Sequence, residues 1–246
     1  MAPHAYVHLS KGALSKASVR RHLVNLGAEH ENLDQKAYQI LKGMIIERQL
    51  LPGDKIPQEK LAEDLGISRT PLVNALKLLE QDKLVQSIPR RGFFVRHFDK
   101  LEMISIFELR EVLEGLAARR AAQNITDKEI AHLKGFFKQF DGLKKITDIR
   151  AYAKEDRLFH TFLLEVSAKE FLKSILETYN IISYSYQFIS EDGLVQSPDD
   201  TIHDHRAIID AISRRDSETA ENLMREHFRK SITTLKRNTE KEKKKE

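Results

Sequence analysis

The chain contains no cysteine among its 246 residues, and it has only 6 prolines and 10 glycines. The absence of cysteine excludes disulfides, thiolate zinc ribbons, iron–sulfur clusters and a cysteine nucleophile, and it is typical of proteins from a reducing cytoplasm. Any metal site must therefore be built from histidine and carboxylate side chains. The scarcity of proline and glycine leaves little room for a loop-rich all-β fold.

Long hydrophobic runs are also missing. The longest apolar stretches span only a few residues, which is too short to cross a membrane. Arg20 and Arg21 are not followed by the apolar segment that a secretory signal requires. We therefore expect a cytoplasmic protein with no membrane partner. The composition, 41% hydrophobic and 32% charged, is that of a soluble globular protein of one or two domains.

The net charge of +4 is unevenly distributed along the chain. Residues 1–98 carry 15 Lys and Arg against 10 Asp and Glu, whereas residues 99–235 carry 20 against 24. A basic front half is typical of a nucleic-acid-binding module, although asymmetries of this size also arise by chance.

In the front half, apolar residues first recur at the spacing of α-helices and then, after about residue 83, in the pattern of β-strands. Apolar spacing predicts helices over 34–45, with Asp34 as N-cap, over 58–65, and from Ser68, a suitable N-cap, to about 80. Leu51-Pro52-Gly53-Asp54 reads as a turn, and residues 84–88 and 93–95 read as two strands joined by a turn. Three helices followed by a hairpin make a winged helix-turn-helix.

The back half is helical throughout, with helices expected at 99–122, 127–143, 148–167, 169–190, 200–214 and 216–236. Six helices are enough for an independent all-α bundle. The expected organisation is an N-terminal extension at 1–32 with one short helix near 18–26, a winged helix at 33–98, an all-α domain at 99–235, and a frayed charged tail at 236–246.

Several residues of the predicted winged helix are suited to contact DNA. Arg69 and Thr70 open the third helix, where an arginine can donate two hydrogen bonds to a guanine edge and a threonine can reach a phosphate or a thymine methyl. Arg90, Arg91 and the flexible Gly92 form the tip of the hairpin, which can follow the backbone or enter the minor groove. Each residue alone can be an ordinary cap or a solvated charge, but the whole run predicts DNA binding.

The stretch Leu61-Ala62-Glu63-Asp64-Leu65-Gly66-Ile67-Ser68-Arg69-Thr70-Pro71-Leu72 resembles the DNA-binding signature of GntR-family bacterial transcription regulators. The segments 51–54, 78–85 and 89–95 fit the same family. The resemblance implies that Arg69 and Thr70 read or grip the operator and that Arg91 and Gly92 serve at the wing. Val73-Asn74 departs from the usual Arg-Glu.

This departure predicts an operator that differs from the family half-site at the position the missing arginine would read. Asn74 can bond an adenine edge if it faces the groove. In the other interpretation Val73 packs inward, and only Arg69 and Thr70 read bases.

The back half carries a set of possible metal ligands. Asp156 and His160 lie four residues apart, on one face of the predicted helix, and His205 and His227 follow on two later helices. One carboxylate and three imidazoles suit zinc, with nickel as an alternative. Such residues are also commonly surface pairs and solvated histidines, so spacing alone leaves both interpretations open.

Residues 100–230 resemble the FCD ligand domain of the FadR subfamily of GntR regulators, through Glu108–Glu114, the Asp156 and His160 motif, the helix of His205, and the segment from Arg214 to His227. The resemblance implies that Asp156, His160, His205 and His227 hold a divalent ion. Arg110 matches the pocket arginine of the family and would clamp a small carboxylate effector; its other possible role is an ion pair with Glu114. We expect His132 and His203 to be surface residues.

The expected function is therefore a metabolite-responsive transcription regulator, not an enzyme, that binds double-stranded operator DNA as a homodimer and carries a metal and a small organic acid in its second domain. Family habit favours a repressor released by its ligand. One alternative is a metal-dependent enzyme that activates water at the His/Asp site. Another is an architectural DNA-binding protein whose bundle is purely structural, in which the four metal positions would be expendable.

Overall fold

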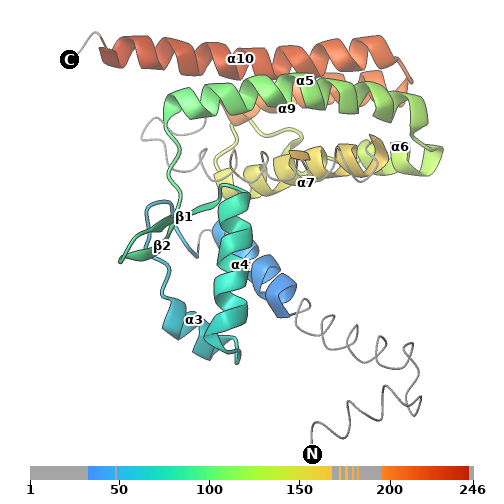
Figure 1. Ribbon diagram of the computed structural model, residues 1–246. Coiled ribbons are helices and arrows are strands. Elements are labelled where there is room, and N and C mark those ends of the chain that lie inside the picture. The colour runs from blue at the N-terminus through green and yellow to red at the C-terminus, as the bar shows by residue number, and fades with distance from the viewer. Residues whose placement is uncertain are drawn as a thin grey trace, which may run out of the picture. The chain divides into compact units, whose positions relative to one another are not determined.

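The computed structural model describes residues 33–47, 49–167, 172, 175, 176, 179, 182 and 195–243. The chain divides into two compact units, Met1–Arg96 and His97–Glu246 (Figure 1). The predicted fold class is confirmed: three helices and a hairpin form a winged helix, and the second unit is helical. None of the described helices combines the length and the apolar character needed to cross a lipid bilayer.

The first unit is built around the apolar faces of its helices. A helix over 33–46 is followed by α3 (Gln58–Asp64) and α4 (Arg69–Gln81). Helix α4 buries Leu72, Ala75, Leu76 and Leu79, the apolar residues expected from its period. The helix over 33–46 begins before Asp34, so Asp34 is not its N-cap as predicted; its carboxylate instead accepts a hydrogen bond from Asn74.

The hairpin consists of β1 (Val85–Ile88) and β2 (Gly92–Val95), which pair antiparallel with Val85 opposite Val95 and Ile88 opposite Gly92. The segment after the turn at 51–54 lines up on the other edge of β2, because the Ile56 amide donates to the Phe93 carbonyl and the Val95 amide donates to the Asp54 carbonyl. Lys55 and Phe94 form the bridge between these segments. The sequence of residues 51–56 has no alternating pattern that would have predicted this second pairing of β2.

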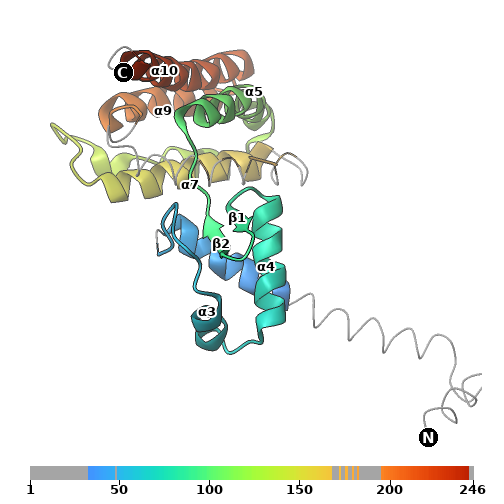
Figure 2. The same ribbon diagram turned by 60° about the vertical axis from the view of Figure 1, so that its left-hand side comes forward.

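The second unit is a stack of long helices (Figures 1 and 2). Its elements are α5 (Lys100–Asn124), α6 (Asp127–Leu133), the short 3-10 helix η1 (Lys138–Phe140), α7 (Ile149–Ser167), α9 (Pro198–Ser213) and α10 (Ser217–Lys243). Helix α5 runs antiparallel to α10 along much of its length. Gly115 allows this approach, because a Cβ there would lie 2.8 Å from Cγ of Arg225.

Two of the predicted helices have other bounds in the structure. The expected helix over 127–143 ends at Leu133, and Phe137 adopts a left-handed backbone with φ of 63° that no helix can continue through. Helix α10 extends to Lys243, beyond the expected end at 236, because Lys236 pairs with Glu108 at 2.9 Å and Lys100 pairs with Glu242. The expected helices over 18–26 and 169–190 fall largely outside the described residues.

Helix α5 starts with a capping box that fixes its first turn. The Asp99 carboxylate accepts from the Glu102 amide at 2.8 Å, and the Glu102 carboxylate accepts from the Asp99 amide at 3.1 Å. This arrangement satisfies two backbone donors that a helix start would otherwise leave without partners.

We predict that Asp99→Ala lowers the free energy of unfolding of the second unit by about 1 kcal/mol, because it removes this N-cap. In a unit of this size the loss corresponds to a fall in melting temperature of about 2–4 °C, which calorimetry can resolve. Asp99→Asn keeps a side-chain acceptor and should retain most of the stability. Equal losses in the two variants would contradict a capping role.

Candidate metal centre and nucleic-acid interface

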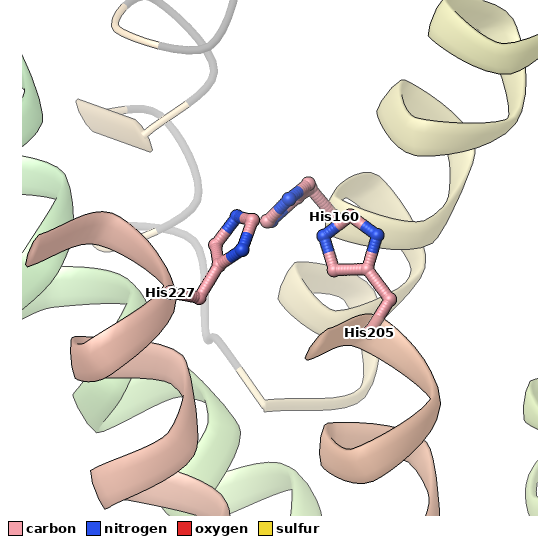
Figure 3. Close-up of side chains that lie close together, drawn as sticks. All are labelled: His160, His205 and His227. Carbon is pink, nitrogen blue, oxygen red and sulfur yellow. The ribbon is translucent and has the colours of Figure 1, made fainter. Parts of the chain in front are cut away.

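Three histidines from three different helices meet in the interior of the second unit (Figure 3). His160 lies on α7, His205 on α9 and His227 on α10, and all three are buried. One ring nitrogen from each lies within 4.8 Å of the corresponding atoms of the other two. Three imidazoles that point at a common centre form a ready arrangement for binding a divalent ion.

Asp156 joins this cluster from the helical turn before His160. Its Oδ1 atom lies 3.6 Å from Nε2 of His205 and 4.0 Å from Nε2 of His160. The Tyr152 hydroxyl donates to the same oxygen at 3.4 Å, which holds the carboxylate from the side. The four residues singled out from the sequence as possible ligands are therefore brought together.

His160 is oriented by a carboxylate that the sequence pattern did not assign to the site. Nδ1–H of His160 donates to Oε2 of Glu114, a buried residue of α5. Because Nδ1 is used in this way, Nε2 is left to face Asp156 and the centre of the cluster. The other carboxylate oxygen of Glu114 accepts from Nε of Arg110 at 2.7 Å.

Burial alone would raise the pKa of Glu114, but the charges of Arg110 and His160 and their hydrogen bonds outweigh it and hold the pKa at about 2. Glu114 is therefore a carboxylate at neutral pH. The pair with Arg110 is the alternative role foreseen for that arginine, and the structure shows it directly.

His227 has a similar acidic neighbour behind it. Its Nδ1 atom lies 3.7 Å from Oδ2 of Asp204, whose other oxygen accepts from Lys230 at 2.7 Å. Burial opposes ionisation of Asp204, yet the contacts with His227 and Lys230 lower its pKa to about 2. Glu114 and Asp204 thus support two of the three imidazoles from outside the cluster.

His205 differs, because both of its ring nitrogens are buried and neither makes a hydrogen bond with any of the described residues. Its ring stacks on Phe137, with centroids 4.9 Å apart and planes 23° apart. Burial, followed by the nearby charges of His227, His160 and Arg110, puts the pKa of His205 well below its usual value. Burial also lowers the pKa of His227, although Asp204 opposes this.

Neutral imidazole is the form that ligates metals, and a buried imidazole without hydrogen bonds costs free energy that a bound ion would offset. The side chains at this centre therefore fit a divalent metal ion. The neighbouring pocket is small, with about 20 Å³ for the centres of water-sized atoms, which is room for one or two of them. It is lined by Phe107, Arg110, Tyr152, Asp156, His160, Val195, Gln196, Thr201, His227, Phe228 and Ser231.

The two surface histidines of the prediction lie where expected. His203 is 87% exposed, two residues before the fully buried His205 on α9. His132 is exposed as well, although its ring stacks on Phe136 with centroids 5.3 Å apart.

In the first unit, Arg69 and Thr70 are exposed at the N-terminal end of α4. The Arg69 side chain is 65% exposed, and its guanidinium lies 3.9 Å from Glu59 of α3, a loose surface contact. Such pairs contribute about 0–1 kcal/mol, so Arg69 remains available to another partner. Ser68 precedes the helix with extended backbone angles, as expected of an N-cap, but its side chain makes no capping hydrogen bond.

The Asn74 side chain is engaged by a neighbouring helix of the same unit. Its amide donates to Oδ2 of Asp34 at 3.0 Å, which links α4 to the helix over 33–46. Val73 beside it is half-buried. Both observations favour the interpretation in which this pair supports α4, while Arg69 and Thr70 face outward.

At the wing tip, Arg90 and Arg91 are exposed, and Gly92 has a φ of 97° that other residues rarely adopt. The Arg91 guanidinium lies 5.4 Å from the centroid of the Phe94 ring, and this cation–π contact restricts the arginine side chain. Arg90 also has a positive φ, of 63°. The tight turn therefore projects two adjacent cations.

Sequence reasoning missed Glu114, Asp204 and Phe137 as parts of the metal centre. Glu114 was recognised only as a neighbour of Arg110 on one helix, since its contact with His160 joins residues 46 positions apart. Asp204 is adjacent to His205 in sequence, yet it supports His227 on another helix. Phe137 stacks on His205 because its backbone adopts a left-handed conformation, and a phenylalanine at this position gives no sign of that conformation.

Two family models match the chain. The model for bacterial regulatory proteins of the gntR family matches residues 33–95, and the FCD domain model matches residues 105–230.

Related bacterial proteins align with about four fifths of the chain. An uncharacterized HTH-type transcriptional regulator, YdhC of Bacillus subtilis, is 27% identical over 81% of this chain and 89% of its own length. The HTH-type transcriptional repressor RspR of Escherichia coli is 24% identical over 80% and 86%. The solved structure of E. coli McbR/YncC, 22% identical, has the same fold, with a TM-score of 0.68 over 84% of this chain and 98% of that one.

These relatives are transcription regulators, so the enzyme alternative is set aside. The two models together account for both units of the molecule, one for the winged helix and one for the helical unit with its histidine cluster. The chain therefore belongs to the GntR family of bacterial transcriptional regulators and carries an FCD domain behind its winged helix.

Proposed function

We propose that this regulator is a cytoplasmic, homodimeric repressor of the FadR subfamily, whose FCD domain binds a divalent metal and a small organic acid that releases it from operator DNA. The observation that carries the proposal is the convergence of Asp156, His160, His205 and His227 beside a pocket that Arg110 also lines. Repression, rather than activation, is supported by the relative RspR, which is named a transcriptional repressor.

In this proposal Asp156 and the three imidazoles hold the ion, which is zinc or, as the alternative, nickel. The ion, when bound, supplies positions at which a carboxylate can coordinate. Glu114 and Asp204 keep His160 and His227 oriented, and Tyr152 keeps Asp156 oriented.

Arg110 places a positively charged guanidinium in a fixed orientation at the wall of the same pocket. Its Nε atom is engaged with Glu114, so the remaining guanidinium donors are the ones that an anionic ligand would meet. Phe228 and Phe107 flank the guanidinium, with 4.6 Å from its central carbon to the centroid of the Phe228 ring. These contacts fix the side chain in place before any ligand arrives, which reduces the entropic cost of binding.

Metal binding is tested by a matched pair of histidines on one helix. We expect His205→Ala to purify without the metal that the parent retains, whereas His203→Ala keeps it, because only His205 faces the cluster. Elemental analysis of both variants gives the metal content. Chelation should lower the melting temperature of the parent and of His203→Ala, because an ion bound only to the folded state stabilises it.

Operator binding should survive in His205→Ala, because the residue lies in the second unit and the proposed DNA contacts lie in the first. Equal metal content in the two variants would contradict the assignment of the centre. Loss of DNA binding together with the metal would point to a structural ion instead.

The effector is tested by a thermal-shift screen of small carboxylates against metal-loaded protein. We expect a hit to raise the melting temperature of the parent and to have a much smaller effect on Arg110→Lys, because lysine keeps the charge beside Glu114 but loses the planar fork that grips a carboxylate. Lysine is preferable to alanine here, because alanine would remove one of the two partners of the buried Glu114, and breaking a buried charge pair costs about 3–5 kcal/mol. A full response in Arg110→Lys would exclude Arg110 from the effector site.

In the first unit we propose that Arg69, Thr70, Arg90, Arg91 and Gly92 contact the operator, and that Asn74 acts through its hold on α4. We expect Arg69→Ala to weaken operator binding by about 1–3 kcal/mol at fixed salt, the usual value of a bidentate contact with a base. Glu59→Gln is the matched control, because it removes only the acidic neighbour of Arg69 and should leave binding equal or tighter. Unchanged affinity in Arg69→Ala would remove this residue from the reading set.

A further inference from the structure

The segment that pairs with the second edge of β2 brings one more side chain onto the outer face of the hairpin. Lys55 forms the bridge to Phe94, and Gln86 of β1 lies opposite Phe94 on the other side. Because directly paired residues point to the same face of a sheet, these three side chains form one row across the hairpin. The other face is buried through Phe93 and Val95, whereas Lys55 and Gln86 are exposed.

The Lys55 side chain extends along β2 toward the tip of the hairpin. Its backbone is paired with Phe94, yet a Cβ at Gly92, two residues nearer the tip, would lie 3.9 Å from Cε of Lys55. The ammonium group is one bond beyond Cε. It therefore lies beside the turn that carries Arg90 and Arg91.

These three cations have no acidic partner among the described residues. Lys55, Arg90 and Arg91 take part in no ion pair in the part of the chain that the structure describes. The neighbouring carboxylate of Asp54 is engaged in the turn before it, where its Oδ2 accepts from the Leu51 amide at 2.9 Å. The outer face of the hairpin thus carries three positive charges without an internal counter-charge.

We infer that Lys55 contacts the phosphate backbone of DNA beside the two arginines of the wing. DNA is the polyanion that regulators of this family bind, and exposed cations without a counter-charge are the surface that such a partner requires. Lysine is a flexible point charge without the planar fork that reads a base edge, so this contact positions the wing and carries no sequence information. The inference adds a residue to the DNA contacts of the proposed function and does not depend on the metal centre.

The experiment is a salt titration of DNA binding by the full-length protein. The two probes are a duplex that the parent protein selects from random DNA and a duplex of unrelated sequence. Each phosphate contact contributes about 0.9 to the slope of log K against log salt concentration, so we expect Lys55→Gln to lower the slope by about 0.9 for each subunit that binds. At about 0.15 M salt the same relation gives an affinity loss of about fivefold per subunit, equal on the two duplexes.

Lys83→Gln is the matched control for this variant. It removes the same charge from another exposed lysine of the first unit, but Lys83 precedes β1, at the end of the hairpin away from the tip. We expect Lys83→Gln to leave the slope and the affinity unchanged. Lys55→Arg keeps the charge and should retain the slope of the parent, which separates the loss of a contact from damage to the sheet.

Arg91→Gln, titrated in parallel, separates this inference from the wing contacts of the proposed function. A lower slope in Arg91→Gln with an unchanged slope in Lys55→Gln would overturn the role of Lys55 alone. Unchanged slopes in both variants would overturn the proposed contact of Arg91 as well. An affinity loss in Lys55→Gln at an unchanged slope, or on the selected duplex alone, would also contradict a phosphate contact.

Discussion

The burial of one carboxylate, Glu114, constrains the second unit more than any other feature. A buried charge is strongly unfavourable unless it is paired and hydrogen-bonded, and Glu114 meets this demand from two directions. Arg110 satisfies one oxygen from within α5, and His160 satisfies the other from α7. Two helices and one imidazole tautomer are thereby fixed by a single residue.

Other parts of the site depend on this arrangement. Because His160 is oriented by Glu114, its second nitrogen faces Asp156 and the other imidazoles, which arrive from α9 and α10. Because Arg110 is held by Glu114 and by the aromatic ring of Phe228, its guanidinium lines the pocket in a defined direction. The polar network is therefore continuous from the interior of α5 to the centre of the histidine cluster.

The sequence predicted those features that depend on local pattern. The order of elements, the apolar face of α4 and the convergence of four distant polar residues followed from period, caps and family resemblance. It failed where long-range contacts decide the outcome. The 127–143 helix was predicted too long because its pattern continues past Leu133, whereas the chain needs a left-handed residue at Phe137 to bring that ring over His205.

The same distinction applies to single residues in the first unit. Asp34 has the chemistry of an N-cap, yet it serves as the acceptor for Asn74, and only the packing of two helices reveals this. Residues 53–56 lack an alternating pattern, and their pairing with β2 is carried by backbone hydrogen bonds that no side chain encodes. Positions defined by backbone or by distant partners are the ones that sequence reasoning could not reach.

Helix α5 is an unbroken rod of 25 residues that begins three residues after the boundary between the two units. At 1.5 Å per residue, Arg110 stands about 16 Å along the axis from Asp99. The capping box joins Asp99 to the first turn of this helix through two hydrogen bonds with Glu102. One continuous helix therefore carries the capped start of the second unit at one point and a pocket-lining arginine three turns further on.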